Sequence, residues 1–239
     1  MTKKILITGA NGQLGHEMRN ALKGNNRFEC IFTDVAELDI CNAEAVKQTI
    51  ADNHIDYIVN CAAYTQVDKA EDNAELCKKI NTDAVENLAR AAADYGARMI
   101  HISTDYVFNG RGYRPYTVDV VPDPQSVYGS TKLEGEKILT DICPESIIIR
   151  TAWLYSPYGN NFVKTMLHLG EEREELSVVA DQIGTPTCAA DLAQAILVIL
   201  QADTFVPGTY HFSDEGACSW YDCTVTIHRL AGITTCRVT

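Results

Sequence analysis

The chain has 239 residues, of which 46% are hydrophobic, and carries a formal net charge of −12 without any basic run. This length and apolar content suit one large α/β domain, or one domain with a small appendage. The negative charge argues against nucleic acid and against an anionic membrane surface as partners. No apolar run reaches the length of a signal peptide or of a membrane span, so we expect a cytoplasmic protein without membrane contact.

The cysteines indicate neither a disulfide framework nor a metal site. They number nine and are scattered without any Cys-x-x-Cys pair. A chain this long can build its core without disulfides, so we expect reduced thiols. Cys218, Cys223 and His228 match no standard spacing of metal ligands, and we predict no metal site.

A short strand over residues 5–7 runs directly into a glycine-rich turn, and a helical pattern over residues 14–22 follows. The glycines have the spacing Gly-x-x-Gly-x-x-Gly. Glycines let the backbone approach a pyrophosphate, and the helix N-terminus offers free N–H groups and the positive end of its dipole. The alternative is a purely steric role for the glycines. We predict a dinucleotide site that includes Gly9, Asn11, Gly12, Gln13, Leu14 and Gly15.

The second predicted strand covers residues 28–34 and ends on Asp34, 19 residues beyond Gly15. An acidic side chain near this position hydrogen-bonds the adenosine ribose in dinucleotide-binding folds. Its charge would repel a 2′-phosphate, so Asp34 favours NADH on local grounds. The alternative is an aspartate that only begins a turn at the end of the strand.

Strands and helices alternate through the next hundred residues. Strands are predicted over residues 56–60, 98–103 and 146–150, and helices over 42–53, 70–95 and 126–141. This alternation predicts a Rossmann-type α/β fold, a doubly wound parallel sheet with helices on both faces. Ligands of such sheets bind beyond the carboxyl ends of the strands. The rule places the glycine turn, Asp34, residues 61–65 and Thr104 around one crevice.

The second half of the chain continues the same pattern without a linker. Helices are predicted over residues 160–170, 189–201 and 221–231, and a strand over 176–180. We expect residues 1–150 to form the NAD(P)-binding domain. Residues 151–239 are expected to complete it and to add a small C-terminal substrate lobe.

The predicted helix over residues 126–141 carries Tyr128 and Lys132, four residues apart and therefore on one face. A free tyrosine has a pKa of about 10, and a nearby cation favours the phenolate and brings the pKa toward the working range. A solvent-exposed pair without function is the alternative. The pair follows a dinucleotide turn and the strand-end hydroxyl of Thr104, which favours a catalytic role.

Further motifs extend over the whole chain: residues 61–65, the block Ser-Thr-Asp-Tyr-Val-Phe at 103–108, Arg-Thr-Ala-Trp at 150–153, Gly-Asn-Asn-Phe at 159–162 and Asp-Gln-Ile-Gly-Thr-Pro-Thr at 181–187. With them, the sequence resembles the dTDP-4-dehydrorhamnose reductase family of the extended short-chain dehydrogenase/reductases. The block at 103–108 is the most specific motif. The resemblance implies NADPH- or NADH-dependent reduction of a dTDP-linked 4-keto sugar, dTDP-4-dehydro-6-deoxy-L-mannose, to dTDP-L-rhamnose.

The resemblance also implies roles for single residues. Thr104 would hydrogen-bond the keto oxygen, Tyr128 would deliver the proton, and Lys132 would hold the cofactor ribose and tune Tyr128. The sugar site would include Asp105, Tyr106 and Trp153, with a core aromatic as the alternative role of Trp153. The expected cofactor site further includes Asp39, Ile40, Ala62, Ala63 and Tyr64.

The sequence departs from the family pattern in two respects. Members of the family continue further, through an Arg-Pro-containing segment and a final helix, so we expect a truncated chain with an incomplete substrate lobe. The family generally uses NADPH, whereas Asp34 favours NADH. Two alternatives stay open: another nucleotide-sugar epimerase or dehydratase, and a non-catalytic regulatory subunit of the methionine adenosyltransferase type. A homodimer is one possible oligomeric state.

Overall fold

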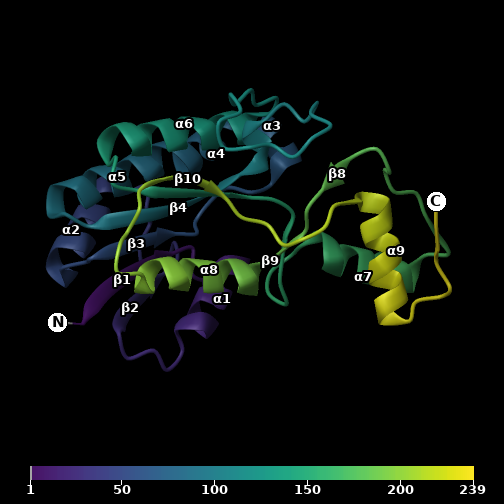
Figure 1. Cartoon of the computed structure of the whole chain (residues 1–239), viewed down its shortest axis with the longest axis horizontal. Helices are drawn as coiled ribbons and strands as arrows, with labels where there is room; N and C mark the ends of the chain where they lie inside the picture. The colour runs from purple at the N-terminus through teal and green to yellow at the C-terminus, as the bar shows by residue number, and fades with distance from the viewer. Residues whose placement is uncertain (1) are drawn as a thin grey trace.

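The centre of the computed structural model, which describes residues 2–239, is a six-stranded parallel sheet (Figure 1). Its strand order is β10-β5-β4-β3-β1-β2, and every neighbouring pair is parallel. The strands are β1 (Lys3–Thr8), β2 (Phe28–Thr33), β3 (Tyr57–Asn60), β4 (Arg98–Thr104), β5 (Ile147–Thr151) and β10 (Gly208–His211). The predicted Rossmann-type doubly wound fold is confirmed.

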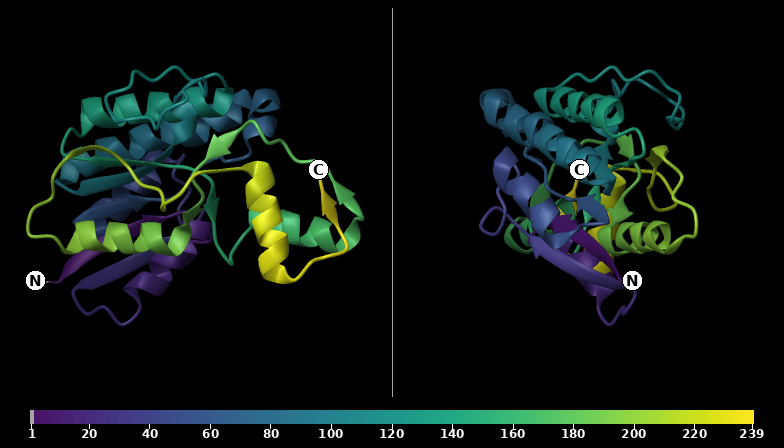
Figure 2. Two further views of the ribbon diagram at one scale, coloured as in Figure 1. Left: turned by 45° about the vertical axis from the view of Figure 1, so that its right-hand side comes forward. Right: turned by 90° about the vertical axis from the view of Figure 1, so that its left-hand side faces the viewer.

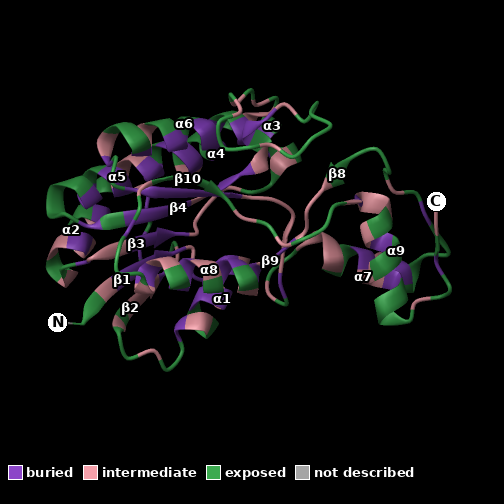
Figure 3. Cartoon of the chain, viewed as in Figure 1, coloured by how far each residue is buried: buried purple, intermediate pink, exposed green. Residues whose placement is uncertain are grey.

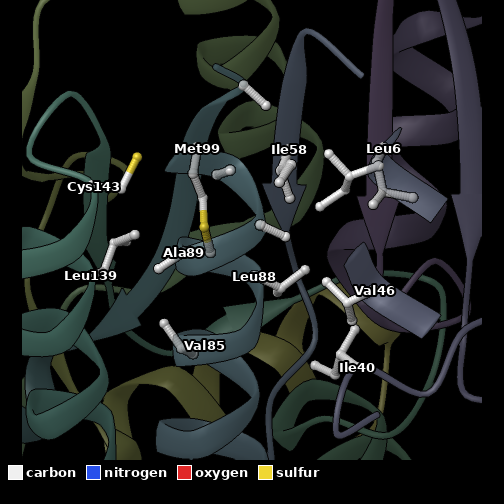
Figure 4. Packing of buried hydrophobic residues seen from close by; sticks show 14 of the residues in the cluster. Leu6, Ile40, Val46, Ile58, Val85, Leu88, Ala89, Met99, Leu139 and Cys143 are labelled. Atoms are coloured by element: carbon white, nitrogen blue, oxygen red, sulfur yellow. The ribbon is translucent and has the colours of Figure 1, made fainter. Parts of the chain in front are cut away.

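Helices cover both faces of the sheet. On one face lie α2 (Ala43–Asn53), α5 (Ala84–Tyr95) and α6 (Val127–Ile142), and on the other lie α1 (Gln13–Leu22) and α8 (Ala189–Gln201) (Figure 1). Successive residues of a strand point to opposite faces. Leu6, Ile58 and Met99 therefore pack with α2 and α5 (Figure 4), whereas Ile5 and Ile7 belong to the core beneath α1 and α8. Figure 3 shows the resulting pattern of buried inner and exposed outer helix faces.

The helix predicted over residues 70–95 is not continuous. It consists of α3 (Val67–Asp72), α4 (Ala74–Lys78), a π-helical turn over Lys79–Asp83, and α5. Within the π turn, the Asn81 amide accepts the Tyr64 N–H (2.9 Å) and donates to the Tyr64 carbonyl (3.1 Å). The carbonyl of Asn81 lies where a Cβ on Gly135 would stand. The widened turn therefore fits this segment against α6 and against the chain after β3.

The elements of the second half that do not cover or join the central sheet, here called the C-terminal part, lie beyond the carboxyl end of β5. It contains α7 (Phe162–Glu172) and α9 (Trp220–Ala231), which pack against each other (Figure 2). Three short strand pairs surround them: β6 (Leu154–Tyr155) with β9 (Thr187–Cys188), β8 (Ile183–Gly184) with β11 (Cys218–Ser219), and β7 (Glu175–Leu176) with β12 (Arg237–Val238).

One strand prediction in this half was wrong, and one strand of the central sheet was not predicted. The strand expected over residues 176–180 is limited to Glu175–Leu176, because only these two residues pair with β12. The edge strand β10 was not predicted, since its Gly-Thr-Tyr-His sequence is short and lacks a hydrophobic pattern. Within residues 2–239 no helix is long and apolar enough to cross a bilayer. The same residues contain no cluster of three or more His, Cys, Asp and Glu side chains that could hold a metal ion.

Candidate active site

The glycine-rich turn joins β1 to α1, and its three glycines have different roles. Gly9 has a φ of 64°, and a Cβ there would lie 2.6 Å from the Ala62 nitrogen. A Cβ on Gly15 would overlap the Gly9 carbonyl and the Ala10 backbone. A Cβ on Gly12 would meet only the Gly9 carbonyl oxygen, at 3.2 Å. Packing of the chain itself therefore requires Gly9 and Gly15, whereas Gly12 leaves its backbone open at the N-terminus of α1.

Polar side chains brace this turn. Asp34 accepts the Asn11 N–H through Oδ2 (3.0 Å) and the Val35 N–H through Oδ1 (2.8 Å). The Gln13 side-chain oxygen accepts the Asn161 amide (2.9 Å). Leu14 is buried in the core between α1 and the sheet. The N–H of Asn11 and the side chains of Gln13 and Leu14 thus support the turn itself.

A cleft of about 390 Å³ opens beside the turn. Seven predicted cofactor residues line it: Gly9, Gly12, Asp34, Asp39, Ile40, Ala62 and Ala63. The lining also includes residues that the sequence reasoning missed, namely Val35, Leu38, Cys41, Leu76, Lys79 and Ile80. The first three follow β2, and the rule that ligands bind beyond strand ends could have found them. The other three come from α4 and the π turn, and no local signal marked them.

Tyr128 stands in the first turn of α6, which Ser126 caps by accepting the Gly129 N–H. The Tyr128 ring packs edge-on against Tyr106, with 5.5 Å between the ring centroids. Burial raises the pKa of Tyr128, and a hydrogen bond to Thr104 opposes this effect. The phenol is therefore protonated at neutral pH and lies next to the hydroxyl of Thr104.

Lys132 is 1% exposed and reaches under the end of β4. Its Nζ donates to the Ile102 carbonyl (2.6 Å) and lies 3.3 Å from Nε2 of His101. Burial lowers the pKa of Lys132 to about 8. The sequence predicted that Lys132 lowers the pKa of Tyr128, but the pKa of Tyr128 is raised, because burial outweighs any such effect and Nζ is directed at β4.

Thr104 and Asp105 mark the end of β4 and the start of a short 3₁₀ turn. The Thr104 hydroxyl donates to Oδ1 of Asp105 (3.1 Å) and accepts the Tyr106 N–H (3.2 Å). Burial raises the pKa of Asp105 to about 6, although its hydrogen bond to Thr104 acts in the opposite direction. Asp105 and Tyr106 thus lie beside the two hydroxyls of Thr104 and Tyr128.

Trp153 connects the sheet to the C-terminal part. Its φ of 48° is left-handed, a conformation that few non-glycine residues adopt. The indole stacks on Trp220 with ring centroids 3.3 Å apart and an interplanar angle of 7°. A Cβ on Gly184 would overlap the same indole. Residues from β5, β8 and α9 therefore meet at Trp153.

This arrangement matches known proteins along the whole chain. A family model described as RmlD substrate binding domain matches residues 3–239. The dTDP-4-dehydrorhamnose reductase of Escherichia coli strain K12 is 45% identical over 240 residues, which cover 96% of this chain and 79% of that protein.

Solved structures give the same result. A dTDP-4-dehydrorhamnose reductase from Clostridium acetobutylicum has a TM-score of 0.95 at 50% identity, covering 99% of this chain and 82% of that one. The Bacillus anthracis reductase, solved in complex with NADP, has a TM-score of 0.95 at 41% identity, covering 100% of this chain and 84% of that one. The resemblance seen in the motifs is confirmed, and the chain belongs to the RmlD substrate binding domain family.

Proposed function

We propose that this protein reduces the 4-keto group of dTDP-4-dehydro-6-deoxy-L-mannose with NADPH or NADH and so forms dTDP-L-rhamnose. The observation that carries the proposal is the proximity of the Thr104 and Tyr128 hydroxyls at the end of β4, in a chain with an open glycine-rich turn. The family and the names of the relatives support the same reaction.

The expected cofactor site fits a dinucleotide. Gly12 has no side chain to cover the backbone at the start of α1, and this backbone lies beside the cleft. The N–H groups and dipole of α1 would hold the pyrophosphate. Asp34, Asp39, Ile40, Ala62 and Ala63 would surround the adenosine half, and Tyr64 and Lys132 the other half. A nicotinamide bound there supplies the hydride.

The chain's own residues then handle the substrate oxygen. Thr104 would turn its hydroxyl proton from Asp105 to the keto oxygen, and Tyr128 would transfer its own proton to that oxygen as the hydride arrives at carbon. A buried phenol with a raised pKa keeps this proton at neutral pH. The site therefore suits the direction of reduction.

The sugar site and the division of the chain into domains would be as follows. Asp105, Tyr106 and Trp153 would contact the sugar. Residues 1–150 would form the NAD(P)-binding domain, and residues 151–239 would complete it and provide the substrate lobe. The enzyme would be cytoplasmic, and a homodimer is one oligomeric state that it could form.

The direct test follows the absorbance of NADPH and of NADH, each with purified protein and the 4-keto sugar nucleotide. We expect oxidation of the cofactor that depends on the sugar nucleotide, with the rhamnose nucleotide as product. Cofactor binding without oxidation, under conditions where a known relative turns over, would contradict the reductase assignment and favour a regulatory subunit.

A further inference from the structure

A row of buried polar side chains lies next to the reaction site. Asn60 at the end of β3, His101 in β4 and Lys132 in α6 are each at most 1% exposed. Nδ2 of Asn60 lies 3.0 Å from Nδ1 of His101, and Nε2 of His101 lies 3.3 Å from Nζ of Lys132. Because these groups are shielded from water, their hydrogen-bond partners must come from the protein itself.

The direction of these hydrogen bonds follows from one end of the row. Oδ1 of Asn60 accepts the Ala62 N–H (3.2 Å) and the Thr8 hydroxyl (2.7 Å). A backbone N–H can only donate, so the oxygen of Asn60 is fixed on that side and its NH₂ group faces His101. That NH₂ group also can only donate. Nδ1 of His101 is consequently an acceptor and carries no proton.

The tautomer of His101 is then determined. Burial and the nearby Lys132 hold the pKa of His101 well below its usual range, so the ring is neutral. A neutral imidazole carries one proton, which must be on Nε2. Nε2–H points at Nζ of Lys132. An ammonium group has no lone pair to accept this hydrogen bond, whereas a neutral amine has one.

We propose that His101, held by Asn60 as the Nε2–H tautomer, is a positioning residue that favours the neutral amine of Lys132. Lys132 thereby becomes a group that gains and loses a proton near neutral pH, instead of a permanent cation beside the reaction site. This proposal depends on the proposed function only in the test that measures the pH profile of kcat/KM.

Other groups around Lys132 act on its proton as well. Burial lowers its pKa to about 8, while Glu136 in α6 and Cys77 in α4 act in the opposite direction. Glu136 is itself paired with Arg150 of β5, at 2.7 Å, which reduces its effect on Lys132. The Ile102 carbonyl accepts a hydrogen bond from either form of the lysine. Of these neighbours, only His101 presents a hydrogen-bond donor to Nζ, so it favours the neutral amine of Lys132 over the ammonium.

The tautomer can be measured directly in the parent protein by ¹⁵N NMR of the imidazole nitrogens, without cofactor or substrate. We expect Nδ1 of His101 to be unprotonated and Nε2 to be protonated. Asn60→Asp places a carboxylate opposite Nδ1 and should move the proton to Nδ1. A parent protein with its proton on Nδ1 would overturn the proposal, whatever its enzymatic activity.

A second measurement follows the titration of Lys132 by NMR of its Cε and Nζ atoms, assigned by comparison with Lys132→Met. His101→Phe removes the opposing Nε2–H, so the titration midpoint should rise by about one pH unit. A lower midpoint would show that His101 had accepted a hydrogen bond from the ammonium, and an unchanged one that it does not influence the proton.

The matched control is His168→Phe on the exposed side of α7, which should leave the Lys132 midpoint unchanged. If the protein turns over, the alkaline limb of its kcat/KM profile should move with that midpoint in His101→Phe. A limb that stays fixed while the midpoint moves would separate Lys132 from the reaction.

Discussion

At the scale of single residues, burial changes the pKa values of two acidic side chains and one basic side chain at the site. Burial disfavours the charged form, so it raises the pKa of Tyr128, raises that of Asp105 to about 6 and lowers that of Lys132 to about 8. Two of the three groups therefore titrate within a few units of neutral pH. The phenol of Tyr128 stays protonated.

The first prediction concerns proton delivery by Tyr128. Tyr128→Phe keeps the ring contact with Tyr106 and removes the proton, so turnover should fall by about two to four orders of magnitude. Cofactor affinity, measured by fluorescence titration, should change little. Tyr95→Phe on the outer side of α5 is the control and should keep parental turnover. A Tyr128→Phe enzyme that works at nearly the parental rate would rule out this assignment.

Asp105 provides a prediction about stability and pH. Its pKa of about 6 in the folded protein exceeds the ordinary value of 3.8, so folding is favoured by proton binding. That contribution is complete below pH ~4 and is lost as the pH rises through ~6. Asp105→Asn should therefore be more stable than the parent at pH ~8, by at most about 3 kcal/mol, and similar to it at pH ~4.

Urea unfolding at the two pH values measures this difference. Asp72→Asn on the exposed side of α3 is the matched control, and we expect it to follow the parent at both values. An Asp105→Asn protein that is less stable than the parent at the higher pH would show that the carboxylate is stabilised, not penalised, by its surroundings.

At the scale of elements, the β1–α1 connection separates structural from ligand-binding glycines. Gly15 lets α1 start directly over the Gly9 carbonyl, and Gly9 lets the turn pass against Ala62. Both contacts are made by backbone, which cannot move aside as a flexible side chain can. A Cβ on Gly12 would meet only the Gly9 carbonyl oxygen, at 3.2 Å, which is a tight contact and not an overlap.

The prediction that follows is a contrast between two variants. Gly12→Val should fold like the parent but bind cofactor at least about tenfold more weakly, since the branched side chain occupies the approach of the phosphates. Gly15→Val should unfold at lower denaturant, with a loss of about 1–3 kcal/mol or more. Denaturant unfolding measures the stability of both variants, and fluorescence titration measures their affinity for the cofactor. Equal cofactor affinity of Gly12→Val and parent would place the pyrophosphate elsewhere.

At the scale of the whole molecule, the C-terminal part is attached to the sheet through aromatic stacking. Trp153 follows β5, and its partner Trp220 is the first residue of α9. Phe162 at the start of α7 packs on the same Trp220, with 4.2 Å between the ring centroids. The stack thus joins α7 and α9 to the end of the sheet where Thr104 and Tyr128 lie.

Removing this stack should weaken binding of the sugar nucleotide and leave binding of the cofactor unchanged. Trp220→Ala leaves Trp153 without its partner, so we expect a higher KM for the sugar nucleotide, unchanged cofactor affinity and a loss of about 3 kcal/mol in stability. Trp220→Phe keeps an aromatic surface for Trp153, so its KM for the sugar nucleotide should be close to the parental value. If both variants keep the parental KM, Trp153 does not depend on this contact to bind substrate.

Much of the fold follows from local sequence. The alternating strands and helices, the glycine turn and the shared helix face of Tyr128 and Lys132 all depend on residues a few positions apart. Periodicity and capping encode such features directly. The predicted doubly wound sheet was correct for this reason, whereas the family was identified from the resemblance of the motifs.

Other features were decided only by contacts between distant segments. Lys79 and Leu76 reach the cleft because a π turn fits against Tyr64, and β10 exists because β5 offers it an edge. Lys132 is directed at His101 and at the Ile102 carbonyl, and His101 in turn faces Asn60, so these contacts join residues that are distant in sequence. Burial sets the pKa values and the hydrogen-bond partners at this site, and burial is a property of the packed chain that no local pattern contains.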